Sequence, residues 1–334
     1  MADAKKLSAL ITGASGFVGH RLAERLLEEG WKIRLLVRDA KKLASPLNTR
    51  CEVIIGDLND VAAVSRAVRD VNVIFHCAAN VNTWDNSDAY YAANVLGVTT
   101  LMTAITKENK TLARLVHVST MDVYGFPAVA CNEMSTPNGA GFGYGESKLM
   151  GESVVRELGS QAGISYTIIR PGNIIGPRSQ FITRIGAELK FGIMLTVDKG
   201  QVHAGLVYID NLIDCLIWAS SAHEAHRECY NVRDNYDVSW RTFIDKFRSD
   251  INGKGFVFNL SFSAAEKLAR GLETFHKLLL PRHEPMLHRL LVRFFGRTCG
   301  HSADRIHFFC PTKVGFEEAM QDSIQWFLKQ SKKY

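Results

Sequence analysis

Leu7-Ser8-Ala9-Leu10-Ile11-Thr12-Gly13-Ala14-Ser15-Gly16-Phe17-Val18-Gly19 decides the fold of this 334-residue chain. Residues 7–12 form a short apolar run that predicts a buried strand, and residues 17–30 have the periodicity of a helix. Glycines between a strand and a helix allow a tight turn, let backbone N–H groups approach a pyrophosphate and let the helix pack closely on the strand. We therefore expect a dinucleotide-binding turn formed by Gly13, Ser15, Gly16, Phe17, Val18 and Gly19.

Short apolar runs alternate with longer amphipathic stretches through the first half of the chain. This spacing predicts strand–helix–strand units, a buried parallel sheet and a doubly wound α/β fold of the Rossmann kind. Ligands of such folds bind at the carboxyl ends of the strands. The predicted strands are residues 7–12, 32–37, 52–55, 73–77, 115–119 and 165–170, and the clearest helices are residues 17–30, 89–107 and 144–162.

After residue 170 the alternation becomes less regular, with expected loops at 171–179 and 197–205. We expect residues 1–172 to form a cofactor-binding domain that also carries the catalytic residues. Residues 173–334 would form a smaller, mostly helical substrate-binding region, partly interleaved with the first domain. The later helices are predicted at residues 209–221, 239–250, 263–280 and 316–329.

Composition narrows the class of protein. Hydrophobic residues make up 46% and charged residues 22%, which is typical of a globular protein with a sizeable core. The seven cysteines are an odd number without a Cys-x-x-Cys pair, which indicates a reducing compartment. No apolar run approaches the 18 residues that cross a bilayer, so we expect no signal peptide, no membrane-spanning helix and a cytoplasmic location.

Charge is distributed unevenly along the chain. The net charge is +6, too mild to imply nucleic-acid binding, and from Arg241 onward 16 Lys and Arg stand against 9 Asp and Glu. Within this basic part, residues 286–297 predict a helix with Arg289, Arg293 and Arg297 on one face. Such a helix could contact an anionic membrane surface peripherally. The favoured interpretation is a helix that covers the substrate pocket with a solvated arginine stripe.

Several strand ends carry residues suited to hold a dinucleotide. Arg38 follows the second strand and can pair with a 2′-phosphate, which favours NADP(H). Asp39 comes next and could serve a ribose 2′-hydroxyl instead, so NAD(H) is the less favoured alternative. The third and fourth strands end in residues that could reach the adenine or lie along the cofactor: Asp57, Leu58, Cys77, Ala78 and Ala79.

A tyrosine and a lysine four residues apart form the catalytic candidate. Tyr144 and Lys148 share a helix face, and a nearby ammonium should lower the pKa of the phenol from its usual value of about 10. The fifth strand ends in Ser119 and Thr120, where a hydroxyl could hydrogen-bond a substrate oxygen. This set is typical of carbonyl and alcohol chemistry. The eleven histidines show no metal-ligand spacing, so no metal site is expected.

These motifs together resemble the extended short-chain dehydrogenase/reductases, and the resemblance covers nearly the whole chain. It implies that Tyr144 is the general acid/base, that Lys148 holds the nicotinamide ribose and that Thr120 polarises the substrate oxygen. Pro171, Gly172, Asn173 and Ile174 would line the nicotinamide end, and Asn94 would be structural. The matching segments are the glycine turn, 57–58, 78–79, 94–99, 118–125, 144–148, 170–173, 207–211 and 315–319.

The branch of the family is decided by departures from its pattern. Relatives that act on nucleotide-sugars usually carry an arginine in the stretch corresponding to residues 201–207, and none is present here. The chain looks more like the 3β-hydroxysteroid dehydrogenase, dihydroflavonol reductase and 3-oxo-acid reductase branch. We therefore expect an NADP(H)-dependent oxidoreductase that interconverts a ketone and a secondary alcohol on a hydrophobic substrate. The resemblance also implies a homodimer formed through the predicted helices 89–107 and 144–162.

Two alternatives stay open. One is a nucleotide-sugar epimerase or dehydratase with tightly bound NAD. The other is a non-catalytic module that senses NADP(H) and regulates a partner, which an intact Tyr144 and Lys148 disfavour.

Overall fold

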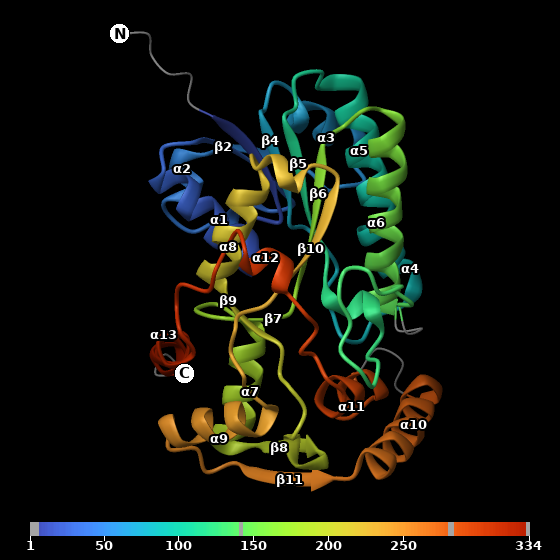
Figure 1. Cartoon of the computed structure of the whole chain (residues 1–334), viewed down its shortest axis with the longest axis vertical. Coiled ribbons are helices and arrows are strands. Elements are labelled where there is room, and N and C mark those ends of the chain that lie inside the picture. Colours follow the sequence, from blue (N-terminus) through green and yellow to red (C-terminus); the bar gives the residue numbers. More distant parts are fainter. Residues whose placement is uncertain (1–6, 140–142, 280–283, 332–334) are drawn as a thin grey trace.

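The computed structural model describes residues 7–139, 143–279 and 284–331, and is built around one seven-stranded sheet (Figure 1). The strand order is β10-β6-β5-β4-β1-β2-β3, and every pair is parallel. This confirms the predicted doubly wound α/β fold. The strands are β1 (Ser8–Thr12), β2 (Lys32–Val37), β3 (Glu52–Ile55), β4 (Val73–His76), β5 (Arg114–Val118), β6 (Tyr166–Pro171) and β10 (Glu228–Val232).

Helices cover both faces of the sheet, because successive strand residues point to opposite sides. In β1, Leu10 packs into the cluster beneath helices α3, α5 and α6, whereas Ala9 and Ile11 pack into the larger cluster beneath α1 and α8. All three side chains are fully buried. The covering helices are α1 (Phe17–Glu28), α3 (Val61–Val68), α5 (Gly97–Glu108), α6 (Gly143–Gln161) and α8 (Ile209–Ala219), with the short α2 (Leu47–Arg50) and α4 (Ser87–Tyr91) between strands.

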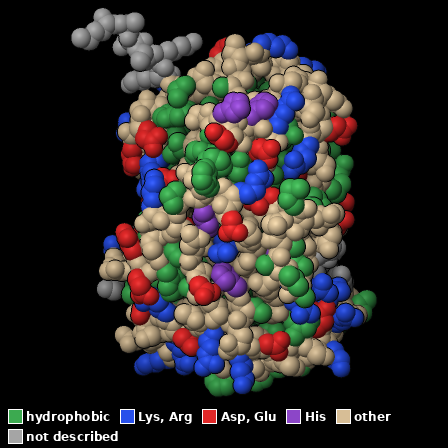
Figure 2. Space-filling view, viewed as in Figure 1, with side chains coloured by type: hydrophobic (Ala, Val, Ile, Leu, Met, Phe, Trp, Pro, Cys, Tyr) green, Lys and Arg blue, Asp and Glu red, His purple; other side chains and the backbone are tan. Residues whose placement is uncertain are grey.

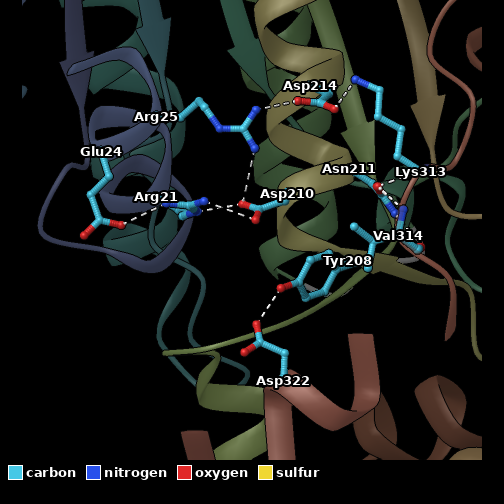
Figure 3. Close-up of polar contacts among 10 residues, drawn as sticks. All are labelled: Arg21, Glu24, Arg25, Tyr208, Asp210, Asn211, Asp214, Lys313, Val314 and Asp322. Carbon is cyan, nitrogen blue, oxygen red and sulfur yellow. Dashed lines mark hydrogen bonds and ion pairs between the residues drawn. The ribbon is translucent and has the colours of Figure 1, made fainter. Parts of the chain in front are cut away.

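The second half of the chain returns to this sheet twice. Strand β10 extends it beside β6, and α8 packs on α1. Figure 3 shows how the segment at the start of α8 is tied down: Asp210 pairs with Arg21 on α1 at 2.6 Å, and Tyr208 donates to Asp322. A domain boundary at residue 172 stays a prediction. Both β10 and α8 come after that residue in the sequence, yet β10 belongs to the central sheet and α8 packs on α1.

A smaller layer lies at the lower end of Figure 1. It contains two two-stranded parallel sheets, of which β7 pairs with β9 and β8 with β11. The predicted loop 171–179 therefore contains a strand, β7. A strand of three residues has too little sequence pattern to be predicted, because it forms only by pairing with the distant β9. The elements here are β7 (Asn173–Ile175), α7 (Gln180–Phe191), β8 (Ile193–Val197), β9 (Leu206–Tyr208), α9 (Trp240–Asp250), β11 (Phe256–Leu260), α10 (Phe262–Leu279), α11 (Arg289–Gly296) and α13 (Phe316–Ser331). The short α12 (Asp304–His307) lies higher, against β10.

The basic segment 286–297 differs from its prediction. Its helix, α11, is shorter than predicted, and the arginine face is turned toward α10 rather than fully solvated. Arg289 pairs with Glu273 at 2.8 Å, and Arg293 with Glu266 at 3.3 Å, both carboxylates being largely buried. Arg297 lies over the ring of Phe262. Membrane contact through this helix stays a prediction, although its cations already have partners.

Within the described residues, no helix combines the length and the apolar character needed to cross a bilayer. On the face shown in Figure 2, acidic and basic side chains are interspersed, and lysines and arginines are frequent at the lower end. That end is formed largely by residues after 240 (Figure 1), where the basic excess of the sequence lies.

Candidate active site

The glycine turn between β1 and α1 is too tight for other residues. Gly13 has φ +77°, and a Cβ there would lie 2.7 Å from the backbone N of Ala78. A Cβ on Gly19 would lie 2.5 Å from the Gly13 carbonyl oxygen, so α1 packs directly on the turn. No side chain in the described part of the chain caps the N-terminus of α1, and no acidic residue lies in its first turn. Exposed Ser15 and Gly16 thus leave the positive end of the helix open to a pyrophosphate.

The end of β4 is held against this turn by a buried hydrogen-bond pair. Thr12 Oγ1 lies 2.7 Å from His76 Nδ1 and accepts the N–H of Ala78 at 3.2 Å. Burial lowers the pKa of His76 to about 3, so its imidazole is neutral. Its ring stacks on His117 at 5.2 Å. Both histidines are packing residues, and the predicted cofactor residues Cys77, Ala78 and Ala79 lie half-buried beside the turn.

At the ends of β2 and β3 the two acidic side chains already have local partners. Asp39 accepts the N–H of Lys41 at 2.9 Å and caps a short 3₁₀ turn, and Asp57 accepts the N–H of Asn59 at 3.0 Å. Arg38 is exposed directly after β2, in no ion pair with any described residue. Leu58 packs against Gly97 at the start of α5. Arg38 is therefore the side chain here that is most available to an anionic group.

Two polar groups of the candidate site lie at the end of β5: the amine of Lys148, which comes from α6, and the hydroxyl of Thr120, which bonds to Tyr144. The buried Lys148 Nζ donates to the Val118 carbonyl at 2.7 Å, and burial lowers the pKa of this amine to about 8. The pKa of Tyr144 is raised by burial and by the nearby Asp122, while a hydrogen bond with Thr120 acts in the opposite direction. The expected lowering of the Tyr144 pKa by Lys148 is thus not observed, because the ammonium is directed to β5.

The two hydroxyls after β5 have different roles. Ser119 Oγ donates to the buried Glu152 at 2.6 Å, so its side chain is part of the core rather than free for a cofactor. Thr120 Oγ1 accepts the N–H of Asp122 at 3.1 Å, which caps the 3₁₀ turn η3 (Met121–Tyr124). This bond does not use the hydroxyl proton of Thr120, which can be donated to Tyr144 or to a substrate oxygen.

Asn94 has the structural role that was expected. It lies in the π-helical turn η2 (Ala92–Leu96), where its amide exchanges hydrogen bonds with the backbone of Asn80 and donates to Ser147 Oγ at 2.9 Å. Ser147 in turn donates to the Tyr144 carbonyl at 2.8 Å. Asn94 therefore fixes the first turn of α6, and with it the position of the tyrosine.

The segment after β6 closes the site on the other side. The N–H of Gly172 bonds to the Val232 carbonyl at 2.9 Å, and Asn173 Nδ2 donates to the Ala204 carbonyl at 2.6 Å. Pro171 is buried at the end of β6, and Ile174 is half-buried in β7. These hydrogen bonds thus fix Gly172 and Asn173, between Pro171 and Ile174, against the neighbouring backbone.

A small cavity lies between residues 172–173 and the C-terminal segment. Phe126, Thr298 and Cys299 contribute to its lining. Sequence reasoning missed the contribution of Asp122 and His301, although Asp122 lies two residues after Thr120 in an already recognised motif. The lining residues are Met121, Asp122, Phe126, Gly172, Asn173, Thr298, Cys299 and His301.

The chain is similar to several known proteins. The sequence pattern of the NAD dependent epimerase/dehydratase family matches residues 9–232. A 4-hydroxy-2-methyl-3-oxo-4-farnesyl-3,4-dihydroquinoline-1-oxide ketoreductase of Stigmatella aurantiaca is 25% identical, covering 87% of this chain and 87% of that protein. A 2-alkyl-3-oxoalkanoate reductase of Stenotrophomonas maltophilia is 26% identical, over 85% and 88% of the two chains. The structure of UDP-glucuronic acid 4-epimerase from Bacillus cereus with NAD superposes with a TM-score of 0.77 at 19% identity, covering 97% and 99%.

Proposed function

Because the chain belongs to the NAD dependent epimerase/dehydratase family, within the extended short-chain dehydrogenase/reductases, we propose that it is an NADP(H)-dependent ketoreductase. Enzymes of this class use NAD(P) and act on CH–OH or C=O groups. The substrate would be hydrophobic, and the reaction would interconvert its ketone with a secondary alcohol. The observation that carries the proposal is that Thr120, Tyr144 and Lys148 come together at the end of β5, where Thr120 bonds to Tyr144 and Lys148 donates to Val118.

The residues of the chain fit a nicotinamide dinucleotide. The open N-terminus of α1 would hold the pyrophosphate, and Lys148 would hold the nicotinamide ribose. When bound, the nicotinamide supplies or accepts hydride. Thr120 would orient the substrate oxygen by donating a hydrogen bond, and Tyr144 would give it a proton or take one away. Lys148, whose pKa is lowered to about 8, still carries its charge at neutral pH, and its ammonium has donors beyond the one given to Val118 that could bind ribose hydroxyls.

Cofactor preference is tested by titrating the protein with NADPH and with NADH. We expect NADPH to bind at least tenfold more tightly, about 1.4 kcal/mol, because exposed Arg38 can pair with the 2′-phosphate. Arg38→Ala should remove the difference, while Lys32→Ala, at the far end of β2, should leave it unchanged. Equal or tighter NADH binding would contradict the NADP(H) assignment.

Proton transfer is tested with Tyr144→Phe. The variant should lose most of the turnover of ketone substrates, by about 100-fold or more, because the phenol oxygen carries the proton. Binding of NADPH should stay close to that of the native protein. Turnover near the native rate would show that another group supplies the proton.

A nucleotide-sugar epimerase is the second candidate, favoured by the family pattern and by the likeness to the UDP-glucuronic acid 4-epimerase fold. That reaction would need NAD retained through oxidation and re-reduction of one substrate. Protein purified with non-exchanging NAD would support it, whereas free exchange with added NADPH supports the reductase.

The homodimer through α5 and α6 remains part of the proposal. Three apolar side chains are substantially exposed near these helices, Tyr91, Leu96 and Met150. A monomer mass in light scattering at micromolar concentration would contradict this dimer.

A further inference from the structure

Asp122 lies between the candidate proton donor and the small cavity. It is in η3, directly after the end of β5, and it lines the cavity together with Asn173, Cys299 and His301. Burial raises the pKa of Tyr144 and of Cys299, and the negative charge of Asp122 adds to the increase in both, so the carboxyl lies near both groups. A substrate whose reacting oxygen meets Tyr144 would therefore place its neighbouring atoms next to this carboxyl.

The fold uses the backbone of Asp122 but not its side chain. The N–H donates to Thr120 Oγ1 at 3.1 Å, and the carbonyl accepts the N–H of Gly125 at 3.0 Å. Across residues 7–139, 143–279 and 284–331, the Asp122 carboxyl has neither a hydrogen bond nor an ion pair, unlike the carboxyls of Asp39 and Asp57. A half-buried carboxyl without a partner is destabilising, and a donor on a ligand would relieve this cost.

Among the residues that the structure describes, no cationic side chain pairs with the Asp122 carboxyl. Tyr144 comes from α6, Asn173 from β7, and Cys299 and His301 from the segment after α11. Burial lowers the pKa of His301 to about 4, with a smaller contribution from Arg233, so this imidazole is neutral at pH 7. The reaction end of the cavity therefore accepts hydrogen bonds and repels anions.

We propose that Asp122 determines substrate specificity by accepting a hydrogen bond from a hydroxyl or amino group on the carbon next to the reacting carbonyl. The same carboxylate excludes ligands that carry a carboxylate or phosphate on that carbon. This inference rests on the proposed ketoreductase function, because it takes Tyr144 to mark the position of the reacting oxygen. It narrows the substrate to a neutral or cationic ketone with a donor beside the carbonyl.

The test uses two matched pairs of ketones. The first pair is 1-hydroxy-2-decanone and 2-decanone, which differ in the adjacent donor. The second is methyl 3-oxodecanoate and 3-oxodecanoate, which differ in the adjacent charge. Reduction is followed by NADPH oxidation, and binding of each ketone to the protein–NADP⁺ complex is measured by calorimetry. The test variant is Asp122→Asn, and the control variant is Asp250→Asn on the surface of α9.

In the native protein and in the Asp250→Asn control, 1-hydroxy-2-decanone should bind at least tenfold more tightly than 2-decanone. Methyl 3-oxodecanoate should likewise bind at least tenfold more tightly than 3-oxodecanoate. In Asp122→Asn both preferences should fall below about threefold, while 2-decanone keeps its affinity. Burial raises the pKa of Asp122 to about 6, so the native preference for ester over acid should weaken from pH 7.5 to pH 5. The Asn variant should show no such change.

The outcomes separate the two proposals. If the native protein reduces none of the ketones, the ketoreductase proposal fails, but the binding preferences in the NADP⁺ complex still decide the role of Asp122. The proposed role of Asp122 is overturned if the binding preferences are the same in the native protein and in Asp122→Asn. It is also overturned if 1-hydroxy-2-decanone does not bind. Should Asp122→Asn not fold, Asp122→Ser and the pH dependence of the native preference give the same decision.

Discussion

Single residues at the cofactor turn are constrained by geometry in two separable ways. Gly13 needs a left-handed backbone, at φ +77°, and also faces the backbone of Ala78 closely. Gly30 has a similar φ of +83°, but a Cβ there would meet nothing within 4 Å. The pair therefore separates the cost of the backbone conformation from the cost of the close approach.

Gly13→Ala should abolish measurable NADPH binding and reduce the free energy of unfolding by more than about 2 kcal/mol, because conformational strain and a backbone clash add. Gly30→Ala should cost only the strain, about 1 kcal/mol, and should leave NADPH binding intact. Urea unfolding and nucleotide titration measure both quantities. Equal losses in the two variants would mean that the approach of Ala78 to the turn is unimportant.

At the scale of elements, a buried polar chain joins α6 to three neighbouring elements. Arg170 on β6 binds Glu152 on α6 through two hydrogen bonds of 2.8 and 2.6 Å, and also donates to Tyr124 in η3 at 2.9 Å. Tyr124 donates to Asn231 on β10 at 3.0 Å. The chain fixes the helix that carries Tyr144 and Lys148 against the sheet, although none of its members is proposed to touch the substrate.

Two arginines contact the same carboxylate and give a matched comparison. Arg170 is 4% exposed and 2.6 Å from Glu152, whereas Arg156 is 42% exposed and 3.7 Å away. Arg170→Met should lower the free energy of unfolding by about 3–5 kcal/mol, because it removes the buried charged partner of Glu152 and leaves only the longer, exposed contact with Arg156. Arg156→Met should change it by less than about 1 kcal/mol. Thermal and urea unfolding distinguish these values, and similar effects of the two changes would contradict the importance of burial.

Elements with a strong local pattern were predictable from the sequence, and elements that depend on distant partners were not. The first six strands and the glycine turn follow from apolar runs and turn residues. Strand β7 could not be predicted, because its three residues become a strand only by pairing with β9. The arginine face of α11 was predicted as a face, but its partners Glu266 and Glu273 lie on another helix and no spacing rule connects them.

The site shows the same division between local and distant information. Thr120, Tyr144 and Lys148 lie in short motifs, so their meeting at one strand end could be expected. The direction of the Lys148 amine toward Val118, and the raising of the Tyr144 pKa by burial and by Asp122, depend on packing that the sequence does not contain. Asp122 was missed for a related reason, since its importance comes from a cavity that the C-terminal segment completes.

At the scale of the whole molecule, one carboxylate joins three distant segments. Glu284, before α11, accepts hydrogen bonds from Thr83 in the loop after β4 at 2.7 Å, from Arg184 on α7 at 3.3 Å, and from His288 at 3.0 Å. The ring of Trp84 lies 5.5 Å from that of His288. The indole thus helps to connect the loop after β4 to the C-terminal region.

This junction should depend on pH with a definite sign. The hydrogen bond from His288, followed by that from Thr83, lowers the pKa of Glu284 to about 2, below its usual value of 4.5. A carboxyl whose pKa is lowered in the folded state stabilises that state above pH 4.5, and this contribution is lost as the pH falls from 4.5 toward 2. Because Glu284 is 38% exposed, solvent screening should reduce its contribution to about 1 kcal/mol or less.

Glu284→Gln should therefore lower the melting temperature by a few degrees at pH 7, and the difference from the native protein should shrink at pH 3.5, where the native carboxylate contributes less. Hydrogen exchange of residues 284–296 should quicken at pH 7, while the central strands keep their protection. Glu317→Gln, which breaks the exposed pair with Lys246, is the control and should alter neither region. A difference that persists unchanged at pH 3.5 would show that Glu284 acts through its shape, and not through its charge, in joining the loop after β4 to the C-terminal region.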